Sequence, residues 1–271
     1  MFSRLLFALL LSASSVFGEP VQPLSGTHAH NDYEHVHPLM DALSYGFSSV
    51  EADIYLVDNA LLVAHELKKV TPEKTLESLY LAPLEEQIRK NAGTVYGTNF
   101  DFVLMIDIKG NGNEVYPVLQ KVLLKYQHIL THYSAASVKR GPVSVVLSGS
   151  RPSASLLAEA QDRLVALDGK VKELTAADSN LLYPWVSENW ADFFTWKGIG
   201  DFQPDEKDRL YELVRRFHKE GRKVRFWNTP QTEQFWAAEL ACGVDYLNVD
   251  DLARAKQFLV KKLIVPGDSK P

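Results

Sequence analysis

The chain has 271 residues, of which 46% are hydrophobic and 23% charged, and its formal net charge is -5 at pH 7. This length suits one large domain with a substantial core. The mildly acidic balance excludes a globally basic surface, so we predict no nucleic-acid partner. A local cation can still attract a small anionic substrate.

The first residues have the pattern of a signal peptide. Arg4 provides a positive charge, an apolar run follows over 5–11, and small residues lead to a cleavage point after Gly18. The run is too short to span a bilayer as a stable helix, and no later stretch approaches that length. We therefore predict a leader over 1–18, one mature domain over 19–271 without a transmembrane segment, and a secreted or periplasmic location.

Short β-rich apolar runs then alternate with amphipathic stretches, which is typical of βα units around a parallel sheet. The predicted strands end near His28, Ile54, Lys109, Ser148, Asp168, Ser187, Asn228 and Asp250. The predicted helices cover about 38–46, 75–91, 114–130, 153–161, 205–220, 232–242 and 252–263. This count favours an α/β fold, a TIM-like (β/α)₈ barrel, with its fifth helix the weakest part. Catalytic residues of such barrels lie at the C-terminal ends of the strands.

The first predicted strand leads into Gly26–Tyr33, where six of eight side chains are polar or ionisable, among them His28, His30 and Asn31. This density favours a functional turn, although a solvated loop with two incidental histidines gives the same pattern.

The second predicted strand carries two carboxylates on one face. Glu51 and Asp53 are two residues apart in an apolar, β-branched setting, so both side chains point the same way. Two buried carboxylates repel each other and lose their hydration, and a divalent cation relieves both costs. Oxygen ligands suit Mg²⁺ or Ca²⁺. The alternative is an exposed edge strand with a polar face.

The third predicted strand is a nearly continuous apolar run that ends in Asp107 and Lys109, again on one face. Asp107 is a candidate third metal ligand, and Lys109 is a candidate contact for a phosphate oxygen. A structural Asp–Lys ion pair is the alternative. His65 closes a short apolar run just after the acidic strand. A lone histidine at such a place is more often structural than catalytic, but its position beside the strand of Glu51 and Asp53 favours a catalytic role.

Later signals are weaker. Ser148, Ser150 and Arg151 follow a strand, Arg225 and Trp227 share one face, and Tyr183, Trp185 and Ser187 alternate along another run. They are candidates to line a pocket for an organic group. The single cysteine, Cys242, lies at an apolar helix end and is predicted to be a buried small side chain.

Together, His-Asn, Glu-x-Asp, His and Asp-x-Lys resemble the phospholipase-C-like phosphodiesterase superfamily, which includes glycerophosphodiester phosphodiesterases and sphingomyelinase D-type phospholipases. Within it, the segments His28–Tyr33 and Ser49–Asp53 most resemble the family of the yeast "altered inheritance of mitochondria" protein.

This resemblance implies roles for the candidate residues. His30 and His65 would be the two catalytic histidines, with His28 the second choice for the first of them, and Lys109 would contact the phosphate. The metal ligands would be Glu51, Asp53, Asp107 and Asn31. Trp227 resembles the aromatic residue of a late Trp-Thr-Val motif in which Asn228 replaces the threonine.

The resulting hypothesis is phosphodiester cleavage with one divalent cation, acting on a small phosphodiester or a phospholipid. One histidine deprotonates the attacking hydroxyl and the other protonates the leaving alkoxide. Two other hypotheses remain. A zinc hydrolase of the amidohydrolase or PHP type also opens with His-x-His but needs later strand-end histidines. A secreted binding barrel with a structural cation needs no turnover.

Overall fold

The computed structural model describes residues 21–134, 136–158 and 162–264. The predicted leader over 1–18 therefore lies outside the described residues. Among the helices of the described part, none is long and apolar enough to cross a bilayer.

Eight parallel strands form a nearly closed barrel, which confirms the predicted fold. They are β1 (Leu24–Ala29), β2 (Phe47–Val57), β4 (Phe102–Lys109), β7 (Val143–Gly149), β8 (Val165–Gly169), β9 (Trp185–Asn189), β10 (Lys223–Trp227) and β11 (Leu247–Val249). Their order is β10-β9-β8-β7-β4-β2-β1-β11. A single parallel bridge from Arg225 to Tyr246 joins the two end strands. Each predicted strand end falls on or close to an observed one.

Three further strands are hairpin additions that the sequence reading did not assign. β3 (Ala60–Val63) pairs antiparallel with β2, and β5 (His132–Tyr133) pairs with β6 (Val138–Lys139). Asp58 and Asn59 join β2 to β3 with φ angles of 49° and 63°. A two-residue loop with both φ values positive is the hairpin turn that Asp and Asn tolerate best. The Asp-Asn pair was therefore the missed signal for β3.

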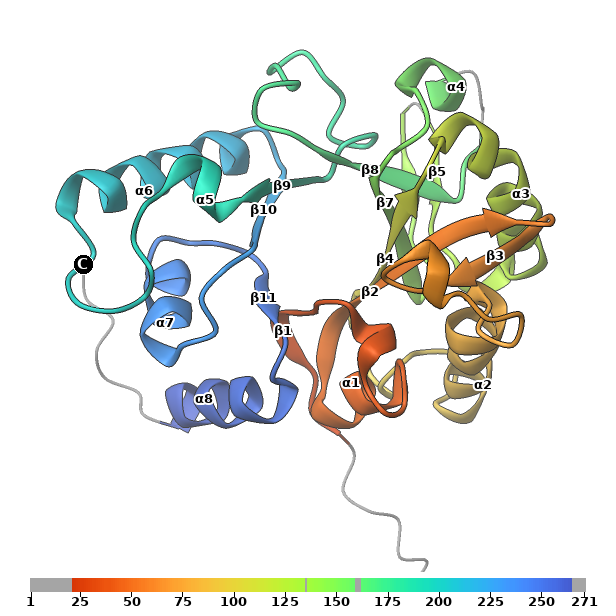
Figure 1. Ribbon diagram of the computed structural model, residues 1–271, viewed down its shortest axis with the longest axis horizontal. Helices are drawn as coiled ribbons and strands as arrows, with labels where there is room; N and C mark the ends of the chain where they lie inside the picture. Colours follow the sequence, from red (N-terminus) through yellow and green to blue (C-terminus); the bar gives the residue numbers. More distant parts are fainter. Residues whose placement is uncertain (1–20, 135, 159–161, 265–271) are drawn as a thin grey trace, which may run out of the picture.

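The helices surround the barrel in a ring (Figure 1). They are α1 (Met40–Tyr45), α2 (Ala82–Lys90), α3 (Gly112–Lys125), α4 (Ala154–Ala158), α5 (Trp190–Phe193), α6 (Pro204–Lys219), α7 (Glu233–Ala241) and α8 (Leu252–Ile264). A π-helical turn, Glu77–Leu81, precedes α2, and a 3₁₀ turn, Gln127–Ile129, follows α3. No helix lies between β8 and β9 in the described chain, which is where the predicted count was weakest.

Alternation along the strands separates two apolar regions. On β4, Leu104 and Ile106 belong to the large core between barrel and helices, whereas Val103 and Met105 face the barrel interior. The interior residues Val103, Met105, Val146, Trp185 and Tyr246 form a small cluster that we call the floor. The next interior positions along β4 are Asp107 and Lys109, so the polar part of the interior lies toward the C-terminal ends of the strands, which we call the mouth.

Candidate active site

Three carboxylates meet at the mouth. Asp53 on β2 is the register partner of Asp107 on β4, and Glu51 lies one interior position below Asp53. One oxygen from each carboxylate lies within 4.8 Å of the other two. Burial, followed by the charge of Glu51, raises the pKa of Asp53 to about 6. Asp53 Oδ1 is buried and has no hydrogen-bond partner among the described residues, as expected of an atom that awaits a cation. The donor set fits Mg²⁺ or Ca²⁺.

Lys109 compensates part of this charge. Its Nζ lies 3.0 Å from Asp53 Oδ2 and 2.7 Å from Asp107 Oδ1. Burial lowers the pKa of Lys109, but the carboxylates Asp107 and Asp53 outweigh burial and hold the pKa above its ordinary value. The ion pair between Asp107 and Lys109, which was the structural alternative for these two residues, is therefore present. Because one ammonium cannot neutralise three carboxylates, the pair leaves the need for a further cation in place.

Glu51 is held from the floor side by two donors. Its Oε2 lies 3.1 Å from His28 Nε2 and 3.5 Å from Arg225 Nη1. Burial raises the pKa of Glu51, but His28 and Arg225 outweigh it and keep the pKa well below the ordinary range. Burial and then Arg225 lower the pKa of His28 to about 4. His28 is fully buried, with its other nitrogen 2.8 Å from Ser49 Oγ, so both ring nitrogens are engaged inside the barrel.

His30 has a different setting. It follows the end of β1, its side chain is 27% exposed, and its Nδ1 lies 2.8 Å from Asp250 Oδ1 just beyond β11. Burial is the largest single influence on the pKa of His30 and lowers it, but the hydrogen bond to Asp250 and the charges of Glu51 and Asp250 together outweigh burial and hold the pKa above its ordinary value. A carboxylate on Nδ1 orients the ring and leaves Nε2 to exchange a proton, the arrangement of a general base.

His65 and Asn31 join the carboxylates through Tyr33. The Tyr33 hydroxyl lies 2.8 Å from Asp53 Oδ2, 2.8 Å from Asn31 Oδ1 and 3.2 Å from His65 Nδ1. His65 Nδ1 is itself 3.4 Å from Asp53 Oδ2. Asn31 adopts a left-handed conformation with φ 48°, and this turn brings Tyr33 back over β2. Burial and the neighbouring Asp53 raise the pKa of Tyr33, so the hydroxyl stays protonated at neutral pH.

Gly149 makes room for Asp107. Its φ is 66°, and a Cβ at this position would collide with Asp107 Oδ1. A side chain at 149 would therefore be strained and would also displace a candidate metal ligand. Glycine is the residue that both the backbone and the site require.

The residues that gave weaker signals in the sequence have two kinds of position. Some hold other side chains in place inside the barrel, and others lie near the C-terminal ends of the strands. Arg225 is buried and donates to Ser187 Oγ and Asn248 Oδ1 in addition to its contact with Glu51. Trp185 stacks on Tyr246 in the floor at 3.9 Å between ring centroids. Ser148 donates to Asp168, Arg151 contacts Glu173, and Tyr183 lies just before β9. Trp227 ends β10 with 37% of its surface exposed.

Three hydrogen bonds were not predicted from the sequence: Tyr33 with Asp53, Asp250 with His30, and Arg225 with Glu51. Tyr33 was inside the densest polar segment, and Asp250 was at the end of the last predicted strand. Both residues lay in segments that the sequence marked as candidate sites, but the sequence did not indicate which side chain each one would contact. Cys242 is buried, as predicted.

The zinc hypothesis finds no support in the later strands. Within the described ranges, the only group of three or more metal-ligating side chains is the carboxylate group. Four of the five remaining histidines pair with carboxylates elsewhere: His37 with Asp41, His128 with Glu85, His132 with Asp162 and His218 with Asp245. The fifth, His35, has a buried Nε2 without a hydrogen-bond partner among the described residues and belongs to no group of metal-ligating side chains there.

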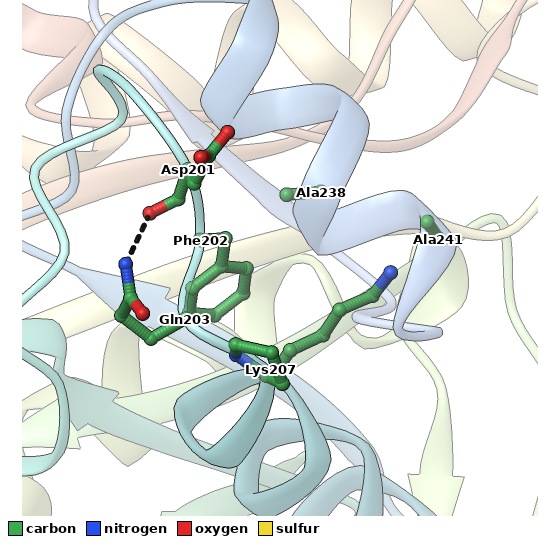
Figure 2. A pocket seen from close by; sticks show the side chains of 7 residues that line it. Asp201, Phe202, Gln203, Lys207, Ala238 and Ala241 are labelled. Carbon is green, nitrogen blue, oxygen red and sulfur yellow. Dashed lines mark hydrogen bonds between the residues drawn. The ribbon is translucent and has the colours of Figure 1, made fainter.

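A surface hollow lies beside the start of α6 and the end of α7 (Figure 2). Phe202, Gln203 and Lys207 line it on one side, and Ala238 and Ala241 line it on the other. It brings together no set of acids and histidines, so the mouth remains the candidate active site.

The structure defines a (β/α)₈-type barrel with acidic and histidine side chains gathered at the C-terminal ends of its strands. Residues 16–168 match the family model of the AIM6-like phosphodiesterase domain, and the chain belongs to this family. It is 31% identical to the altered inheritance of mitochondria protein 6 homolog of Arthroderma benhamiae over 266 residues, covering 85% of this chain and 82% of the relative.

Solved structures support the fold. A glycerophosphodiester phosphodiesterase from Parabacteroides distasonis superposes with a TM-score of 0.53 at 13% identity, covering 89% of this chain and 99% of the other. A calcium-dependent phosphoinositol-specific phospholipase C from a Pseudomonas species gives 0.54 at 12% identity, with coverage of 86% and 91%. At these identities the likeness concerns the fold.

Proposed function

We propose that this protein is a phosphoric diester hydrolase that depends on one divalent cation, Mg²⁺ or Ca²⁺. The observation that carries the proposal is the group of three carboxylates at the mouth, in which the buried Asp53 Oδ1 has no hydrogen-bond partner in the part of the chain that the structure describes. Glu51, Asp53 and Asp107 would hold the cation, with Asn31 beside them. When bound, the cation would neutralise charge on a phosphate oxygen.

Charge supports a diester as the substrate. The three carboxylates exceed the two neighbouring cations, Lys109 and Arg225, by one negative charge. A divalent cation turns this into an excess of one positive charge, which matches the single charge of a phosphodiester. A phosphomonoester with two charges matches less well. Turnover of bis(p-nitrophenyl) phosphate should therefore exceed that of p-nitrophenyl phosphate.

Two histidines supply acid and base. His30, oriented by Asp250, takes the proton of the attacking hydroxyl, and His65 gives a proton to the leaving alkoxide. Lys109 turns its ammonium from the carboxylates toward the phosphate. His28 holds Glu51 in place from below. The attacking hydroxyl comes from water or from the substrate, and a cyclic phosphate in ³¹P spectra of the products would identify the second case.

Exposed apolar side chains in segments that follow β1, β3 and α5 support an amphiphilic, phospholipid-type substrate. Val36 after β1, Leu67 after β3 and Ile199 after α5 are 85%, 57% and 78% exposed. If these side chains contact lipid, the double substitution Val36→Ser and Ile199→Ser should reduce turnover of a diester in vesicles. Turnover of a soluble diester should stay unchanged. Leu124→Ser, at an exposed site in the last turn of α3, is the matched control.

The test of the function is hydrolysis of soluble diesters and phospholipids with Mg²⁺, Ca²⁺ or EDTA. We expect EDTA to abolish turnover and His30→Ala to lower it by about 10²–10⁴-fold. His132→Ala is a matched control, because His132 also pairs with an aspartate at 2.9 Å and is 23% exposed, but it lies on β5. Turnover that survives EDTA and His30→Ala would contradict the proposal.

The N-terminal pattern leads us to propose export as well, with removal of residues 1–18. N-terminal sequencing of the protein from the medium or periplasm tests this. A cell-retained chain that still begins at Met1 would refute it.

A further inference from the structure

We infer that Tyr33 is a positioning residue whose hydroxyl donates its hydrogen bond to Asp53 and thereby fixes His65 with its proton on Nδ1, so that His65 exchanges protons with substrate through Nε2. The kinetic part of this inference rests on the proposed function. The assignment of protons does not, because it follows from the hydrogen bonds alone.

A tyrosine hydroxyl has one proton to donate and can accept two hydrogen bonds. Three groups surround the Tyr33 hydroxyl within hydrogen-bond distance: Asp53 Oδ2, the Asn31 amide and His65 Nδ1. An ionised carboxylate can only accept, and a hydrogen bond to a charged acceptor is the strongest of the three. The Tyr33 hydroxyl therefore donates its single hydrogen bond to Asp53, and the Asn31 amide and His65 Nδ1 have to donate to the hydroxyl oxygen.

For His65, donation to Tyr33 means that Nδ1 carries the proton. The second neighbour of Nδ1 is Asp53 Oδ2 at 3.4 Å, which also accepts and therefore favours the same tautomer. The ring is half-exposed, and no hydrogen bond to Nε2 occurs among the described residues. Nε2 is thus left free at the mouth, as an acceptor in neutral His65 and as a donor in the protonated ring.

For Asn31, donation means that the amide nitrogen faces Tyr33. The oxygen and nitrogen of an asparagine amide are assigned from their neighbours, and the two orientations occupy the same space. In this orientation the Asn31 carbonyl oxygen is released from Tyr33. A free carbonyl oxygen is a ligand type that Mg²⁺ and Ca²⁺ accept, so the same proton arrangement serves the metal ligand and the histidine.

The structure locks Tyr33 in this position. Its ring is 7% exposed, and the preceding Asp32 is fully buried. Asp32 Oδ2 accepts hydrogen bonds from the Leu39 amide at 2.6 Å and from the Tyr80 hydroxyl at 3.0 Å. The segment from β1 to α1 is thereby tied to the π-helical turn that contains Tyr80.

The first experiment needs no substrate. Long-range ¹H–¹⁵N spectra of the metal-free full chain report the tautomer of each histidine, and His65→Gln identifies the His65 signals. We expect His65 to carry its proton on Nδ1 in the wild type and this preference to weaken in Tyr33→Phe, where only Asp53 remains to accept from Nδ1. A wild-type His65 with its proton on Nε2 would overturn the inference even if the variant failed to fold.

The second experiment uses turnover and metal binding. We expect Tyr33→Phe to lower kcat by about 10–100-fold with little change in KM, and to weaken Mg²⁺ or Ca²⁺ binding in calorimetry. Tyr96→Phe is the control, since Tyr96 is equally buried and its hydroxyl donates to a backbone carbonyl, that of Phe47. Tyr33→Phe with unchanged tautomer, kcat and metal affinity would also overturn the inference. A tautomer change in a protein that hydrolyses no diester would leave the positioning intact and refute the proposed function.

Discussion

The floor and the mouth of the barrel interior are built from the same strands, yet their effects on the stability of the fold are opposite. On β4, Val103 and Met105 pack against Val146 and Trp185, and two residues further Asp107 begins the charged group. The floor removes apolar surface from water, whereas the mouth gathers like charges at a cost. One strand face thus changes from stabilising the fold to supporting chemistry within a single two-residue step.

The largest effect should come from a mouth residue and should concern activity alone. Asp53→Asn removes the central carboxylate, and the loss of several kcal/mol of charge stabilisation corresponds to a turnover about 10³-fold lower. The metal-free variant should be at least as stable as the wild type, because a buried like charge is removed. Initial rates and thermal melts measure the two effects. A large drop in melting temperature with activity retained would reverse the assigned roles.

A floor residue should give the opposite result. Met105→Ala leaves a cavity among fully buried side chains and should cost about 2–5 kcal/mol of unfolding free energy. Divalent-cation affinity of the folded variant should stay close to that of the wild type. Urea denaturation and calorimetry test this pair of expectations. An unchanged stability would mean that the floor does not hold the barrel together.

A smaller effect is expected at a buried acid that lacks the cations of the mouth. Glu239 on α7 is fully buried, burial raises its pKa well above the ordinary value, and neither carboxylate oxygen has a partner among the described residues. The folded state therefore binds its proton more tightly than the unfolded state. Stability is complete below the unfolded pKa and falls as pH rises above it.

Glu239→Gln should remove this pH dependence. The variant should be more stable than the wild type at pH 8, with the difference declining toward pH 4. Denaturation curves at several pH values provide the measurement. A stability difference that stays constant with pH would show that Glu239 titrates normally.

The sequence predicted the barrel and the carboxylate group because both depend on local periodicity. Glu51 and Asp53 must share a face in any strand, and parallel strands bring their C-terminal ends together. The difference between His28 and His30 was not predictable in this way. They are two residues apart, but β1 ends at Ala29, so one remains walled in by neighbouring strands and the other emerges beside Asp250.

Contacts made by turns and by distant segments were likewise beyond local reasoning. Tyr33 reaches Asp53 because Asn31 reverses the chain in a left-handed conformation. Arg225 on β10 contacts Glu51 on β2 across the interior of the nearly closed barrel. Such pairs depend on how the barrel closes, which the spacing of residues in one segment does not contain.

In the proposed mechanism, the His30–Asp250 pair also links activity to the completion of folding. The two residues are 220 positions apart, and they meet because the first barrel strand, β1, is hydrogen-bonded to the last, β11. Contacts between such distant segments form late and slowly. During synthesis the histidine would remain without its carboxylate until the final strand docks, so a partly made chain would carry its metal ligands but no oriented base.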